Sequence, residues 1–148
     1  METIKINKSV IDDLKFGLAQ ELVFKPVLEE FLGFKLEQTP QNDTFDYINE
    51  EFKILIEMKS RKNKKQQYPT TMIGENKWKA SGQKCKDGWD IYYVFNFTDK
   101  LCIYKFKKDN RDKIKKSTGG RRDRGRPEFK YYRYIPIELL SDIEYEIV

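Results

Sequence analysis

One apolar segment, residues 52–59 (FKILIEMK), constrains the fold of this chain more than any other stretch. Its side chains alternate between two faces, which predicts a β-strand. One face, which we expect to be buried, holds Phe52, Ile54, Ile56 and Met58, and the other holds Lys53, Leu55, Glu57 and Lys59. A strand this apolar is not expected at a sheet edge. A carboxylate and an ammonium group two residues apart therefore point the same way from a rigid element.

A second carboxylate, Asp46, lies eleven residues before Glu57. A turn centred near Glu50 would pair Asp46 with about Ile54, so that Asp46 and Glu57 become diagonal neighbours, about 7–8 Å apart at Cα. Two such carboxylates can share a hard divalent cation, and a nearby lysine can orient a water molecule. The pattern favours phosphodiester cleavage. The alternative is an exposed Glu57–Lys59 ion pair on one strand face.

The composition excludes several classes of enzyme and site. The chain has no histidine, so Ser-His-Asp and Cys-His catalysis, histidine-ligated zinc and nucleases with a histidine base are all ruled out. Its two cysteines, Cys85 and Cys102, form no CxxC pair, which favours two reduced thiols. No apolar run reaches the length of a membrane span, and the first residues lack a signal-peptide apolar region. We therefore expect an intracellular, cytoplasmic protein.

Positive charge is concentrated in two places. Residues 105–133 hold 13 Lys/Arg against 4 Asp/Glu, within a chain of net charge +5. A second basic cluster follows the apolar strand and contains Lys59, Arg61, Lys62, Lys64 and Lys65. Clustered positive charge near aromatic residues favours a nucleic-acid partner. Two alternatives are solvated basic loops that only maintain solubility, and a partner-binding subunit whose basic loop docks an acidic protein.

The order of predicted elements is α-β-β-β-α-β-β-β-α, a mixed α/β fold in a single domain over residues 1–148. The first helix, residues 10–32, is capped by Ser9, interrupted by Pro26 and stopped by Gly33. The second helix begins at Thr70 or Thr71 and ends near Lys86. Strands are expected over 34–38, 45–48, 52–59, 91–97, 101–106 and 129–135. Residues 107–127 are expected to form a long basic loop, and Pro136 begins a closing helix that runs to about Tyr145.

Asp46 on one strand and Glu57-Met58-Lys59 on the next, within an α-β-β-β-α-β order, resemble the PD-(D/E)XK nuclease superfamily. Gly17-x-x-x-Glu21 is similar to the first-helix glutamate of its Holliday-junction-resolvase-like and phage-exonuclease-like branches. The resemblance covers roughly residues 15–106 and departs from the usual pattern at Phe45, where a proline commonly stands. It implies a restriction-endonuclease-like αβββαβ core over about 10–106, with a mixed sheet flanked by helices. The basic loop 107–127 and a C-terminal strand and helix over 128–148 would be additions.

The resemblance also implies a set of site residues. The catalytic group would be Asp46, Glu57, Lys59 and Glu21. Mg²⁺, or Mn²⁺ in its place, would bind Asp46, Glu57, Glu21 and the Met58 carbonyl. Nearby carboxylates favour a protonated Lys59, which suggests an orienting and electrostatic role. Glu21 lies in the middle of an apolar helical arc, where an unpaired charge is costly, although a simple salt bridge with Lys25 would also explain it.

Substrate contacts are predicted from residue type and position. A helix N-terminus near Tyr68, Thr70 and Thr71 suits phosphate, and the resemblance implies that Lys77 of the second helix faces the site. The remaining predicted phosphate ligands are Arg61, Lys62, Arg121, Arg122, Arg124 and Arg126. Three tyrosines, Tyr131, Tyr132 and Tyr134, could stack on unpaired bases, although alternating aromatics also fill sheets.

The implied function is a metal-dependent, structure-specific endodeoxyribonuclease of DNA recombination or repair, similar to a resolvase. It would leave 5′-phosphate and 3′-hydroxyl ends, with DNA favoured over RNA. A two-fold substrate would require a homodimer. Two alternatives stay open on the same fold. One is a non-catalytic nucleic-acid-binding module, and the other is a sequence-specific restriction endonuclease.

Overall fold

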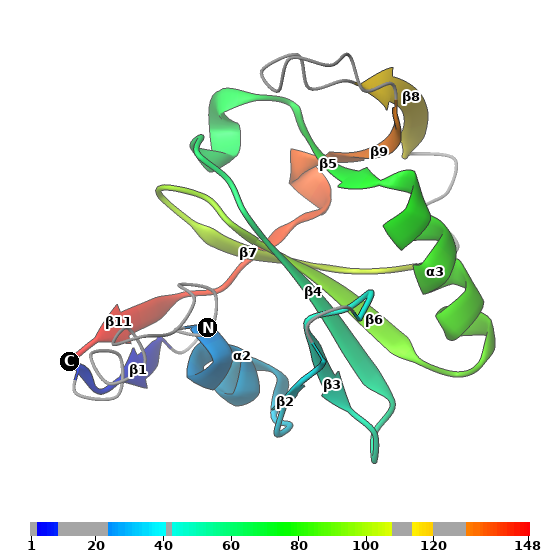
Figure 1. The fold of residues 1–148 in the computed structure, drawn as a ribbon. Coiled ribbons are helices and arrows are strands. Elements are labelled where there is room, and N and C mark those ends of the chain that lie inside the picture. Colours follow the sequence, from blue (N-terminus) through cyan, green and yellow to red (C-terminus); the bar gives the residue numbers. More distant parts are fainter. Residues whose placement is uncertain (1–2, 9–23, 41–42, 108–113, 120–129) are drawn as a thin grey trace.

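The predicted apolar strand lies inside a six-stranded mixed sheet in the computed structural model, which describes residues 3–8, 24–40, 43–107, 114–119 and 130–148. The strand order is β10 (Ser141–Asp142), β7 (Leu101–Lys105), β6 (Asp90–Asn96), β4 (Ile54–Ser60), β3 (Tyr47–Asn49) and β2 (Glu37–Gln38). The β4–β6 pairing is parallel and the other four are antiparallel (Figure 1). These features confirm the predicted α/β class with a mixed sheet.

Both faces of β4 are covered, which confirms that it is not an edge strand. Ile54, Ile56 and Met58 belong to one apolar cluster with helix α2 (Lys25–Leu32). Leu55 belongs to a second cluster, which includes Trp78 of helix α3 (Glu75–Lys86). The prediction that Phe52 is buried is wrong. Residues 50–53 form the turn before β4, and the Phe52 side chain is 54% exposed.

Helix α2 is the described part of the first predicted helix. Pro26 lies in its first turn, where the missing N–H costs nothing, so the predicted interruption coincides with a helix start. The predicted stop at Gly33 is confirmed, with φ +78° and its N–H bonded to the Glu29 carbonyl at 2.9 Å. Residues 9–23 of the predicted helix lie outside the described residues.

Helix α3 begins later than predicted. Thr70 and Thr71 do not cap it, because they belong to strand β5 (Thr70–Gly74), and Gly74 precedes the first helical residue. Its end at Lys86 agrees with the prediction. Helix α3 connects the two parallel strands β4 and β6, a pairing that requires a crossover connection.

A second, three-stranded sheet follows the order β5-β9-β8, with β8 at Lys115–Gly119 and β9 at Lys130–Pro136. The predicted 107–127 loop is therefore wrong over β8, while β9 confirms the last predicted strand. An ion pair fixes this sheet to α3, since Arg133 Nε lies 2.7 Å from a carboxylate oxygen of Glu75. The Arg133 guanidinium also lies over the Trp78 ring, 5.6 Å from its centroid.

The predicted closing helix is wrong. The chain after β9 forms one 3-10 turn, η4 (Ile137–Leu139), then β10 and β11 (Tyr145–Ile147). Strand β11 pairs in parallel with β1 (Ile4–Ile6), an element that the sequence did not predict. This pairing joins residues far apart along the chain, so local helix signals such as Pro136 could not reveal it.

One half-buried polar contact connects β10 to the basic segment after β4. Lys65, the first residue of the 3-10 helix η2 (Lys65–Gln67), places Nζ 2.6 Å from Asp142 of β10. The same carboxylate oxygen lies 3.3 Å from the Cys102 thiol, which donates to it. Burial, together with the nearby carboxylate, raises the pKa of Cys102 to about 12. Cys102 is therefore an inert core thiol.

Neither helix in the described part of the chain is long and apolar enough to cross a membrane.

Candidate active site

Asp46 is held in place immediately before β3. Its neighbour Tyr47 pairs with Ile56, yet the Asp46 backbone N–H also bonds to the Ile56 carbonyl, at 2.8 Å. This hydrogen bond extends the contact with β4 by one residue beyond the β3 ladder and fixes the backbone of Asp46 against Ile56. The Asp46 carboxylate accepts the backbone N–H of Met58 at 2.8 Å. Asp46 therefore lies beside Glu57 across the strand pair.

This arrangement corrects the predicted register. Asn49 pairs with Ile54, so the turn occupies residues 50–53 rather than being centred near Glu50. Asp46 consequently lies opposite the 56–58 segment and not opposite Ile54. The flanking residues Phe45 and Tyr47 are buried in the two different apolar clusters. The carboxylate between them is thereby anchored from both faces of the sheet.

Glu57 is a buried carboxylate paired with two lysines. Its residue exposure is 2%. Lys59 Nζ lies 3.1 Å from one carboxylate oxygen, and Lys77 Nζ of α3 lies 2.9 Å from the other. Lys77 also donates to the Thr44 carbonyl, just before Asp46. Both lysines keep partly exposed side chains, 39% for Lys59 and 27% for Lys77. The cluster thus combines a fixed acidic centre with cationic groups at its solvent side.

The Glu57 carboxyl has a raised pKa, and burial is its main cause. Desolvation raises the pKa of Glu57 above its ordinary value of 4.5, and the negative charge of Asp46 raises it further. Lys59 and Lys77 act in the opposite direction without cancelling the rise. A buried carboxylate whose ionised form is disfavoured by a neighbouring carboxylate is arranged as a cation site would require.

The raised pKa of Glu57 predicts a pH dependence of stability. The folded protein binds this proton more tightly than the unfolded chain does, so the contribution is fully present below the unfolded pKa and is lost as pH rises through the folded pKa. Urea unfolding of wild type and Glu57→Gln in EDTA, from acid to neutral pH, measures this effect. The stability of the variant relative to wild type should increase with pH. A difference that stays constant across that range would contradict the assignment.

Some of the other predicted substrate residues make hydrogen bonds within the protein, and others are exposed to solvent. Arg61 donates from Nε to the Thr71 hydroxyl at 3.3 Å and from a terminal nitrogen to the Met72 carbonyl at 2.5 Å. Thr71 is buried, so the predicted phosphate contact from it is not supported by its position. Lys62 and Tyr68 are exposed. Arg61, Lys62 and Tyr68 lie in the chain segment that connects β4 to β5.

Five predicted site residues lie outside the described residues. They are Glu21, Arg121, Arg122, Arg124 and Arg126. The structure therefore brings together Asp46, Glu57, Met58, Lys59 and Lys77.

Sequence reasoning missed the residues that support Lys77 from behind. Tyr93 is the β6 partner of Glu57 in the sheet, and its hydroxyl lies 2.5 Å from the Ser81 hydroxyl. Ser81 in turn donates to the Lys77 carbonyl at 2.8 Å. This contact holds the first turns of α3 against β6 behind Glu57. The available signal was the Lys77-x-x-x-Ser81 spacing, which places both residues on one helix face.

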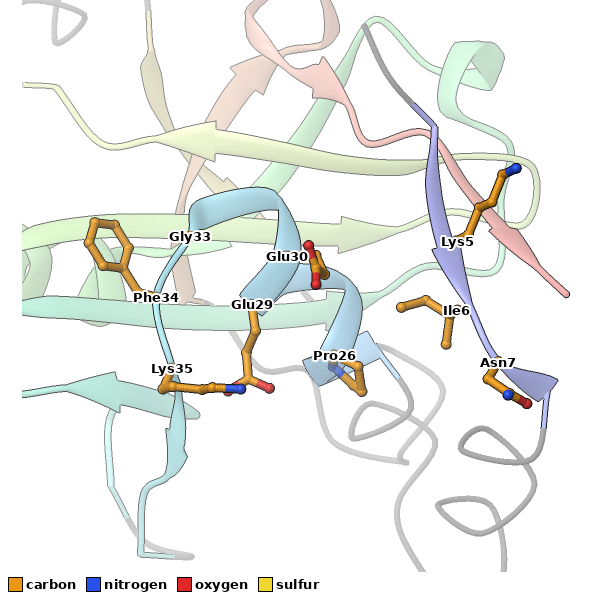
Figure 2. Close-up of a pocket in the computed structure, with 9 residues that line it drawn as sticks. All are labelled: Lys5, Ile6, Asn7, Pro26, Glu29, Glu30, Gly33, Phe34 and Lys35. Carbon is orange, nitrogen blue, oxygen red and sulfur yellow. The ribbon is translucent and has the colours of Figure 1, made fainter.

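A cavity of about 430 Å³ lies elsewhere, between α2, β1 and the segment after Gly33 (Figure 2). Its lining includes Lys5, Glu29 and Lys35. Glu29 accepts a hydrogen bond from the Leu36 N–H at 2.8 Å, so this carboxylate has a structural role in holding the segment after Gly33. Helix α2 covers the sheet face of Ile56, whereas Glu57 faces α3. The cavity is therefore separate from the carboxylate cluster.

Comparison with known proteins assigns the chain to a family. Residues 15–143 match the family described as "Phage putative PDDEXK endonuclease". No curated protein matches the chain. The match spans most of the chain and includes Asp46, Glu57 and Lys59. Together with the mixed sheet and its flanking helices, it confirms the predicted PD-(D/E)XK superfamily and is consistent with a restriction-endonuclease-like fold. The chain belongs to this family, within the PD-(D/E)XK superfamily.

Proposed function

We propose that this chain is a metal-dependent endodeoxyribonuclease whose site consists of Asp46, Glu57 and Lys59. The observation that carries the proposal is the placement of one carboxylate just before β3 beside a second, buried carboxylate on β4, with an ammonium group 3.1 Å from the buried one. An arrangement that only stabilised the fold would gain little from a second negative charge beside buried Glu57. Family membership supports the same reading.

The oxygen donors fit a hard divalent cation, Mg²⁺ or Mn²⁺. Among the described residues no group of three or more His, Cys, Asp or Glu side chains comes together, so Asp46 and Glu57 would be joined by backbone and water oxygens, as Mg²⁺ commonly accepts. Met58 is suited to this role. Its N–H points to Asp46, and in a strand the carbonyl of the same residue points to the same side. When bound, such an ion supplies Lewis-acid stabilisation of phosphate charge.

Two lysines of the protein contribute to the reaction by orienting groups and stabilising charge. Lys59 is partly exposed beside Glu57, so its ammonium group can orient the attacking water and stabilise negative charge on the phosphate. Lys77, fixed by Glu57 and Thr44, keeps the carboxylate in one orientation. Water oxygen forms the new bond to phosphorus, the bond to the 3′ oxygen breaks, and that oxygen takes a proton. The products are 5′-phosphate and 3′-hydroxyl ends.

The finer assignment follows the superfamily resemblance. We propose DNA as the substrate, a structure-specific cleavage of branched or damaged DNA as in recombination or repair, and action as a homodimer in the cytoplasm. A chain with one carboxylate site needs a second copy to cut both strands at a two-fold junction.

A nicking assay tests the proposal. Supercoiled plasmid and a four-way DNA junction are incubated with the full chain in Mg²⁺, Mn²⁺ or EDTA. We expect metal-dependent cleavage that is lost in Asp46→Asn. The matched control is Glu75→Gln, which removes another buried carboxylate that pairs with Arg133 instead of the site. Cleavage that survives Asp46→Asn, or wild type that binds DNA and never cuts it, would overturn the nuclease assignment.

A further inference from the structure

The small sheet has one face that does not pack on α3. Cross-strand pairing aligns Met72 with Tyr134 and Tyr134 with Lys115, and it aligns Tyr132 with Ser117. Alternation puts Lys130 on the same side as both tyrosines. We call this surface the tyrosine face; it consists of Met72, Lys115, Ser117, Lys130, Tyr132 and Tyr134.

The opposite face of the sheet packs against the protein interior and α3. Ile73 and Ile135 are buried, and Arg133 bonds Glu75 of α3. Tyr131 shares this side, with the Lys116 ammonium group 4.8 Å from its ring centroid. The three tyrosines of β9 therefore separate into one that belongs to the α3 side and two, Tyr132 and Tyr134, that belong to the tyrosine face.

The tyrosine face is accessible and carries lysines. Met72 is 40% exposed, Lys115, Ser117 and Lys130 are exposed, and Tyr132 and Tyr134 are half-buried. The sequences of β5, β8 and β9 contain no Asp or Glu. A surface that combines half-buried aromatic rings with lysines at its margins is complementary to a polyanion that carries flat rings.

The spacing of the two tyrosines selects an unpaired strand over a duplex. Residues two apart on a strand are separated by roughly 6.5–7 Å, which is wider than the stacking distance in a duplex and suits bases along an extended single strand. Stacked bases inside a duplex expose only their edges, so ring-on-ring contact requires unpaired bases. Lys115 beside Tyr134 and Lys130 beyond Tyr132 are placed to contact the phosphates on either side.

We propose that the tyrosine face binds an unpaired segment of nucleic acid, with Tyr132 and Tyr134 stacking on its bases. The inference rests on the proposed nuclease function, because it supplies the part of the substrate that the carboxylate site does not read. The small sheet lies beyond the end of β4 that carries Lys59, and Arg61 bonds β5 directly after that end (Figure 1).

Binding in EDTA tests the inference independently of cleavage. Fluorescence anisotropy compares a blunt duplex with the same duplex extended by a thymidine tail. Wild type should prefer the tailed DNA, and the Tyr132→Leu/Tyr134→Leu double variant should lose that preference, with roughly tenfold or greater weakening on the tail. The Tyr132→Phe/Tyr134→Phe variant should retain it, since phenylalanine still stacks. Tyr131→Leu, on the opposite face, is the matched control and should behave as wild type.

A second readout does not depend on the stability of any variant. A 2-aminopurine base placed in the tail should be quenched when wild type binds, as expected for stacking on tyrosine. Equal wild-type affinity for blunt and tailed DNA, an unquenched tail, or a preference retained by the folded leucine variant would overturn the inference while leaving metal-dependent cleavage intact. Loss of tail binding in that variant, in a protein that never cuts DNA, would instead support the tyrosine face and reject the nuclease.

Discussion

Glu57→Gln should reduce metal-dependent cleavage by about 10³-fold or more, because a neutral amide cannot hold a divalent cation beside Asp46 and several kcal/mol of charge stabilisation are lost. The substitution keeps the shape of a side chain that is only 2% exposed, so the loss should not come from repacking. Initial rates of plasmid nicking at saturating Mg²⁺ measure it. Activity within tenfold of wild type would show that Glu57 is not a ligand.

The same variant should fold at least as well as wild type in the absence of metal. At neutral pH the Glu57 carboxylate bears both the desolvation penalty and the repulsion from Asp46, and the amide bears neither. Thermal unfolding in EDTA therefore separates lost chemistry from lost structure. A site that is less stable than its neutral analogue is a common consequence of selection for activity.

Lys59→Met should lower the cleavage rate by about 10²–10³-fold, a magnitude typical of removing one preorganised charge-stabilising group. Lys59 is 39% exposed and faces the solvent side of Glu57, where a substrate phosphate would approach. Methionine keeps most of the apolar stem, so stability should change little. Single-turnover rates on a labelled junction measure the loss, and Lys53→Met, in the turn before β4, is the matched control.

Lys59→Arg distinguishes two roles for this residue. An orienting cation can be replaced in part by arginine, whereas a neutral general base cannot, because arginine stays protonated. We expect Lys59→Arg to retain substantially more activity than Lys59→Met. Equal loss in both variants would favour a proton-accepting lysine and would change the assigned role without removing Lys59 from the site.

The parts of the fold that could be predicted are those determined by local sequence patterns. The strand of Ile54, Ile56 and Met58 is central because apolar residues occupy both of its faces, and that property is visible in the sequence. The end of α3 at Lys86 and the stop at Gly33 were also predictable from local residue types. Each of these features depends on residues within a few positions of one another.

The wrong predictions share a different cause, which is pairing between distant segments. Strand β5 reads as a helix start because Thr70 and Thr71 are good caps, yet β9, more than fifty residues later, makes it a strand. The prediction of a closing helix was wrong for the same reason, because the last residues of the chain pair with β1 as strand β11. The position of Asp46 opposite residues 56–58 depends on the length of the turn after Asn49, whose exact residues alternation does not specify.

The two cysteines have consequences for how this protein can be studied. Cys102 is fully buried and bonded to Asp142, whereas Cys85 is partly exposed on α3, the helix that carries Lys77. A maleimide fluorophore should therefore attach to native protein at Cys85 alone, with no engineered cysteine and no removal of a natural one. The wild-type chain thus has a natural position for a fluorescent label on α3, the helix that contacts both the carboxylate site and the small sheet.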